Sequence, residues 1–144
     1  MQCEANAVLI SIHPKYVSKI LDGTKKVEFR RVWATKKVTH MVIYSTSPEM
    51  KVTAIAEIDS AVVTDKESLW DIAKEYGGGL TKRELVEYFS GVSKGHALIL
   101  KEITELVTPL PLNEIFPETR APQSYIYLTD EQFQAVQKKV ALGA

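Results

Sequence analysis

At the start of the chain, hydrophobic residues first form a continuous run, as in a buried strand, and then recur at helical spacing. Residues 7–12 form a short apolar run bounded by polar residues and a proline, which predicts a buried strand. Pro14 then suits the first turn of a helix, in which Val17 and Ile20 recur at helical spacing. Gly23 stands where a left-handed cap would end that helix.

Strand-like and helix-like patterns of hydrophobic residues also divide the rest of the chain into short strands and helices. Val27 and Phe29 alternate with Glu28 and Arg30, as in a strand with two different faces. Strands are predicted over residues 25–31, 38–44, 52–63, 96–107 and 124–128. Helices are predicted over residues 69–76, 81–89 and 129–140, the last two beginning with capping boxes, and a proline-spaced loop over residues 109–122.

This order of elements determines the expected fold class. About six strands are interrupted by short helices without regular βαβ alternation, which indicates an α+β domain. We expect a small, strongly bent mixed sheet or β-barrel with flanking short helices. Residues 1–144 are predicted to form a single domain, because the chain shows neither an internal repeat nor a linker.

Composition narrows the setting in which the protein acts. The 144 residues are 45% hydrophobic and 25% charged, which is ordinary for a soluble domain with a real core. Cys3 is the one cysteine and can form no internal disulfide, which favours a reducing compartment, and we expect the cytoplasm. No apolar run approaches the roughly 18 residues of a membrane helix, so neither secretion nor a membrane span is expected.

Charge is balanced in total and uneven along the chain. Residues 1–53 contain nine Lys and Arg against four acids, a net charge of +5, so the remainder carries −5. A basic segment can form a local surface that attracts phosphates, and it can also be an ordinary solvated face.

Gly23, Lys25, Glu28 and Arg30 together form the pattern G-x-K-x-x-E-x-R directly after the first helix. This pattern resembles the signature of the ASCH domain family, which belongs to the PUA-like superfamily of small β-barrels. Residues 11–14, 43–48, 96–100 and 122–125 look like further landmarks of single-domain members. The resemblance covers nearly the whole chain.

The resemblance implies a cleft that binds RNA or a modified nucleoside. Lys25, Glu28 and Arg30 would line it. The other residues expected to contact the ligand are His13, Tyr44, Gln123 and Ser124. For Tyr44, packing in the core is an equally good interpretation.

Some compact family members resemble amidases that hydrolyse N4-acetylcytidine with a lysine, a threonine nucleophile and a glutamate. Here Glu28 occupies the position of the threonine, and Thr24 lies on the other side of Lys25. A lysine needs a hydroxyl to activate, so this acyl-transfer route is disfavoured. Glu28 could instead act as a general base on water or a ribose hydroxyl.

The spacing of Lys25, Glu28 and Arg30 can also be interpreted from strand geometry alone. Glu28 and Arg30 project from one strand face roughly 6.6–6.8 Å apart. Lys25 precedes the regular strand and can turn toward Glu28. An acceptor between two cations can read a base edge while the cations hold phosphate, and the alternative is an internal salt-bridge network.

Three hypotheses about function remain. The first is a module that binds RNA or a nucleoside; the second is a hydrolase acting on RNA or a modified nucleoside, with Lys25 and Glu28 as catalytic residues; the third is a regulatory protein that binds a small ligand. No cofactor is expected, and the scattered histidines, His13, His40 and His96, disfavour zinc. Trp33, flanked by basic residues, is expected to be exposed and able to stack on a base.

Overall fold

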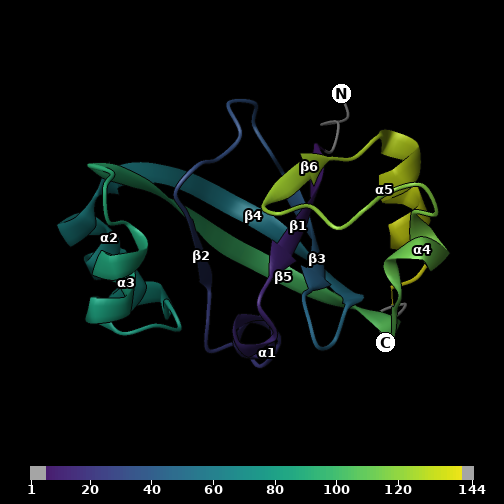
Figure 1. Ribbon diagram of the computed structural model, residues 1–144, viewed down its shortest axis with the longest axis horizontal. Helices are drawn as coiled ribbons and strands as arrows, with labels where there is room; N and C mark the ends of the chain where they lie inside the picture. The colour runs from purple at the N-terminus through teal and green to yellow at the C-terminus, as the bar shows by residue number, and fades with distance from the viewer. Residues whose placement is uncertain (1–5, 141–144) are drawn as a thin grey trace.

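The computed structural model describes residues 6–140, so Cys3 lies outside the described residues (Figure 1). The strands are Ala7–Ile12 (β1), Val27–Arg30 (β2), His40–Ser45 (β3), Lys51–Asp65 (β4), Lys94–Leu110 (β5) and Tyr125–Tyr127 (β6). The helices are Pro14–Leu21 (α1), Lys66–Tyr76 (α2), Lys82–Tyr88 (α3), Leu112–Ile115 (α4) and Asp130–Gln137 (α5).

All six strands join one sheet in the order β2-β5-β4-β3-β1-β6. β1 runs parallel to β3, and the other pairs are antiparallel, so the sheet is mixed. The pairing of β4 with β5 shifts register at three places, and such bulges increase bending and twist. The sheet curls into a half-barrel, which confirms the predicted α+β class and the bent mixed sheet.

The helices lie at the two ends of the sheet and at its open side. Figure 1 shows α2 and α3 at one end, α4 and α5 at the other, and α1 between them below β1 and β2. Val27, Phe29 and the α2 residue Leu69 share one apolar cluster, while Phe133 of α5 belongs to a second. A third cluster lies under α1, where Ile20 packs on the sheet. This arrangement places α1, β2 and α3 around one region.

The predicted helix signals are present in the structure. Thr81 and Glu84 form the capping box of α3, and Thr129 and Gln132 form that of α5. α4 was expected to be loop, because its one turn is too short for a periodic pattern. Among residues 6–140, no helix is long and apolar enough to cross a membrane.

Trp33 corrects one expectation about exposure. Its side chain is only 7% exposed, because the loop after β2 turns back toward β6. The Trp33 ring packs against the ring of Tyr125, and their centres are 4.8 Å apart. Basic neighbours in sequence therefore did not indicate exposure.

Candidate functional site

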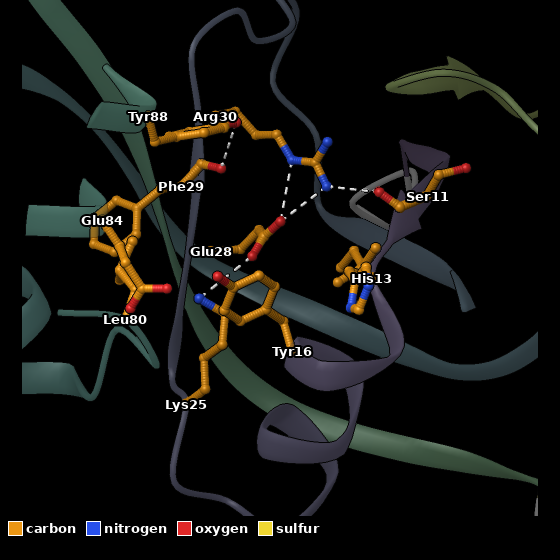
Figure 2. Close-up of a pocket in the computed structure, with 11 residues that line it drawn as sticks. Ser11, His13, Tyr16, Lys25, Glu28, Phe29, Arg30, Leu80, Glu84 and Tyr88 are labelled. Atoms are coloured by element: carbon orange, nitrogen blue, oxygen red, sulfur yellow. Dashed lines mark hydrogen bonds and ion pairs between the residues drawn. The ribbon is translucent and has the colours of Figure 1, made fainter. Parts of the chain in front are cut away.

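A cavity of about 220 Å³ opens between α1, β2, α3 and the end of β1 (Figure 2). Its walls combine charged, aromatic and apolar side chains. They are Ser11, Ile12, His13, Tyr16, Lys25, Glu28, Phe29, Arg30, Leu80, Glu84 and Tyr88. The motif identified in the sequence therefore lines a real hollow.

Arg30 spans this hollow from one strand to another. Its Nη2 donates to the carbonyl oxygen of Ser11 at 2.9 Å. Ser11 lies on β1 and Arg30 on β2, which are separated by three other strands in the sheet. The bond therefore crosses the open side of the half-barrel, where curling brings the two strands together.

Glu28 joins the two cations of the motif. Its Oε2 accepts hydrogen bonds from Nη2 of Arg30 at 2.8 Å and from Nε at 3.1 Å. Its Oε1 lies 3.4 Å from Nζ of Lys25. The side chains of Lys25, Glu28 and Arg30 are only 3%, 9% and 11% exposed. Lys25 does turn toward Glu28, and the three residues also form the internal salt-bridge network considered as the alternative.

The glycine-rich loop after α2 holds Lys25 in place. Nζ of Lys25 donates to the carbonyl oxygen of Gly78 at 2.6 Å, and Lys19 donates to that of Gly79 at 2.9 Å. A Cβ at position 78 would lie 2.8 Å from Cβ of Ala73, so the close approach of this loop requires glycine.

Burial determines the electrostatics of Lys25. Loss of hydration lowers the pKa of Lys25 below its ordinary value, and the charge of Glu28 opposes this shift in part. The rings of Tyr16 and Phe29 lie 5.3 and 5.5 Å from Nζ and add cation–π attraction. Lys25 is thus a buried cation whose proton is less tightly held than that of a surface lysine.

The rim of the cavity carries polar groups from α1 and α3. Nδ1 of His13 accepts from the backbone N–H of Lys15 at 3.2 Å, so His13 caps α1 as well as lining the cavity. The hydroxyl of Tyr88 donates to the carbonyl of Phe29 at 3.2 Å, and burial raises the pKa of Tyr88. Glu84 lies 3.7 Å from Lys15 at the entrance.

Three predicted ligand contacts are absent from the cavity wall. Tyr44 is 5% exposed and packs in the cluster that contains Leu9, on the opposite face of β3 from Ile43. Gln123 and Ser124 lie just outside the wall, where the carbonyl of Ser124 accepts from the N–H of Ser11 at 3.0 Å. Their place in the sequence located the neighbourhood, but the side-chain directions depend on the strand register.

Sequence reasoning missed the parts of the wall that come from outside the motif. Tyr16 lies four residues before the core residue Ile20 on the same face of α1, so its spacing indicated core packing and not a place in the cavity wall. Nothing in the sequence linked Leu80, Glu84 and Tyr88 to the motif, because α3 and the residues just before it reach the motif only through tertiary packing.

A second hollow of about 360 Å³ lies at the other end of the molecule. His40, Glu57, Glu102 and Phe133 contribute to its walls, and burial lowers the pKa of His40. Within residues 6–140, no three His, Cys, Asp or Glu side chains gather as a metal site. Among the described residues, the wall of the second hollow contains the carboxylates of Glu57 and Glu102 and no Lys or Arg, so this hollow is acidic.

The comparisons with known proteins agree with the motif. The model of the ASCH domain matches residues 10–142. An "ASCH domain-containing ribonuclease" of Zymomonas mobilis is 31% identical over 133 residues, which are 88% of this chain and 86% of that protein. The crystal structure of ASCH from Zymomonas mobilis superposes with a TM-score of 0.83 at 28% identity, covering 94% of this chain and 96% of that one.

A longer protein also contains a similar segment. The large ribosomal subunit protein uL22 of Ureaplasma parvum is 29% identical over 124 residues, 84% of this chain. The match spans only 39% of the length of uL22. The family model, the relative and the fold converge on one conclusion: the chain belongs to the ASCH domain family.

Proposed function

We propose that this chain binds RNA, with one nucleotide unit in the cavity of Lys25, Glu28 and Arg30. One observation carries the proposal. Nε and Nη2 of Arg30 are held by Glu28 and Ser11, whereas no hydrogen bond from the described residues engages its Nη1. A guanidinium that is fixed on one side and open on the other is suited to a phosphate or carbonyl oxygen.

The shape and chemistry of the cavity support a nucleotide as the ligand. Its volume is below the range of typical drug-sized sites, which suits one nucleoside unit and not a duplex. Tyr16 and Tyr88 offer aromatic surface. A ribonuclease among the relatives supports RNA as the source of that unit. RNA as partner and the lone Cys3 favour a cytoplasmic location.

Fluorescence anisotropy with a short labelled single-stranded RNA tests this proposal. Arg30→Gln should weaken binding by roughly tenfold or more, because a charge-assisted contact is lost. Arg83→Gln is the matched control: it removes one positive charge from an exposed pair with Glu87 on α3. Equal affinity of both variants would contradict the proposal. Arg30→Lys, which keeps the charge beside Glu28, replaces Arg30→Gln if that variant does not fold.

Binding of nucleosides without any affinity for RNA would favour the small-ligand alternative. The same titration therefore includes cytidine, N4-acetylcytidine and their phosphates. If only a nucleoside binds and Arg30→Gln abolishes its binding, the cavity is a binding site but RNA is not its ligand.

The lowered pKa of Lys25 favours RNA cleavage as a second candidate function. A lysine that gives up its proton more readily can take the proton of a ribose 2′-hydroxyl. The 2′-oxygen then attacks the adjacent phosphorus, the bond to the 5′-oxygen breaks, and that oxygen takes up a proton. The products are a 2′,3′-cyclic phosphate and a 5′-hydroxyl. In this scheme Glu28 holds both cations, and Arg30 stabilises the charge on phosphorus-bound oxygen.

One variant and one modified substrate distinguish cleavage from binding. Lys25→Arg keeps a cation beside Glu28 but removes the base, so cleavage should fall by roughly 10²–10⁴-fold while RNA binding persists. A substrate with 2′-deoxyribose at the cleaved position should bind and stay intact. If the wild-type protein binds RNA and never cleaves it, the cleavage proposal is wrong and only the binding proposal remains.

A further inference from the structure

Two segments of the chain lead away from the cavity and meet beyond it. The first continues from Arg30 through Trp33 to Lys36, and the second runs from Ser124 along β6 to Tyr127. The rings of Trp33 and Tyr125 pack 4.8 Å apart. Nζ of Lys36 lies 5.4 Å from the centre of the Tyr127 ring. Figure 1 shows β6 beside the loop between β2 and β3.

The surface formed by these segments is aromatic and cationic. Tyr125 and Tyr127 lie edge to face with ring centres 5.9 Å apart. Tyr127 is 45% exposed, although it belongs to a strand of the sheet, and Lys36 is exposed as well. Lys37 lies in the same loop, and Asp59 is the acidic side chain that lines the hollow beside it. We call Lys36, Tyr125 and Tyr127 the β6 surface, and the buried Trp33 packs against Tyr125 from beneath.

The β6 surface is continuous with the wall of the cavity. Ser11 lines the cavity, and its N–H donates to the carbonyl of Ser124, the residue before Tyr125. Its hydroxyl donates to the carbonyl of Pro122 at 2.6 Å. On β1, the residue before Ser11 pairs with Tyr125. A chain that leaves the cavity past Ser11 therefore meets Tyr125 and then Tyr127.

We propose that the β6 surface binds the nucleotides of a single-stranded RNA that flank the unit held in the cavity. The inference rests on the proposed function, because it extends the same ligand. An exposed aromatic ring such as that of Tyr127 stacks on unpaired bases of any sequence, and a lysine beside it can neutralise the phosphate between two bases. The bases of a duplex are stacked on one another, so the occupant is single-stranded.

The test compares two RNA lengths on the intact protein. Labelled single-stranded RNAs of two and eight nucleotides are titrated by fluorescence anisotropy. Tyr127→Leu should weaken binding of the longer RNA about tenfold, the loss expected when one stacked base loses its ring. Binding of the dinucleotide should stay unchanged, because its first nucleotide fills the cavity and its second reaches Tyr125 but not Tyr127. Tyr127→Phe keeps the ring and should bind both RNAs as the wild type does.

Lys36→Gln provides a second, independent variant with a matched control. It should weaken only the longer RNA and flatten the salt dependence of that binding. Lys51→Gln removes the same charge from an exposed position at the start of β4 and should change neither RNA. Unfolding temperatures are measured for all variants, so that a loss of fold is recognised.

Each outcome bears on the inference or on the proposed function. Undiminished binding of the longer RNA by Tyr127→Leu and Lys36→Gln overturns the inference and leaves the cavity proposal intact. An equal loss for both lengths also overturns it. If Arg30→Gln binds both RNAs normally while Tyr127→Leu weakens the longer one, the cavity proposal fails, and with it the role of the β6 surface as an extension. If the wild type binds neither RNA, both fall.

Discussion

Arg30 reaches across the open half-barrel to donate from Nη2 to the carbonyl oxygen of Ser11 at 2.9 Å. The same nitrogen donates to Oε2 of Glu28 at 2.8 Å. One guanidinium thus connects β1, β2 and the carboxylate that also faces Lys25. Because these groups are buried, changing any one of them should alter both the stability of the protein and the shape of the cavity.

Glu28→Gln should destabilise the protein. The change leaves Lys25 and Arg30 buried near each other without the carboxylate between them, and breaking a buried ion pair typically costs about 3–5 kcal/mol. Denaturant unfolding measures the free energy. Glu87→Gln breaks the exposed pair with Arg83 and should have little effect. Similar small changes for both variants would mean that Glu28 does not hold the network together.

Lys25 should titrate below the exposed lysines. Burial lowers its pKa from the ordinary 10.5, so between the two values the unfolded chain binds more protons than the folded one. The contribution of Lys25 to the free energy of unfolding therefore rises with pH through that window and is complete above about 10.5. Site-resolved NMR of the lysine ε-carbons measures the midpoint, and a Lys25 midpoint at or above the ordinary 10.5 contradicts the assignment.

Gly78→Ala should destabilise the protein and disturb Lys25. The added Cβ would lie 2.8–3.0 Å from Ala73, Leu80 and Phe29, a degree of overpacking that costs about 1–3 kcal/mol. Because the Gly78 carbonyl accepts from Lys25, the Lys25 titration should shift as well. Gly23→Ala is the control: its Cβ would meet no atom within 4 Å, so it adds backbone strain at a φ of +86° without overpacking and should leave that titration unchanged. A normal Lys25 midpoint in Gly78→Ala would exclude the loop as its support.

RNA affinity should depend on salt. Each phosphate neutralised by a lysine or arginine of the protein contributes a slope of about −0.7 to the logarithm of the binding constant against that of the salt concentration, for single strands. Two contacts, from Arg30 and Lys36, predict a slope of about −1.4. Titrations at several potassium chloride concentrations measure it. A slope of zero would indicate an uncharged ligand and contradict phosphate contacts in the cavity.

The sequence predicted this fold well where the pattern is local. The run at residues 7–12 and the capping boxes at Thr81 and Thr129 correspond to observed elements. β4 and β5 extend past their predicted ends, because pairing with a partner strand continues through exposed polar positions that carry no hydrophobic alternation.

The candidate site was predictable only in part. Lys25, Glu28 and Arg30 were predicted together because four positions of a known pattern adjoin each other in sequence. The partners that fix them, the Ser11 and Gly78 carbonyls, are backbone groups brought close by the curl of the sheet and the loop after α2. Backbone acceptors leave no mark in side-chain patterns.

The proposed RNA site is the cavity between α1, β2 and α3. Backbone NMR spectra of the wild-type protein, recorded while a short single-stranded RNA is added, test this claim most directly. We expect the largest shifts at Ser11, Lys25, Arg30 and Tyr88, which line the cavity. Shifts concentrated instead around His40, at the acidic hollow on the other end of the molecule, would contradict it.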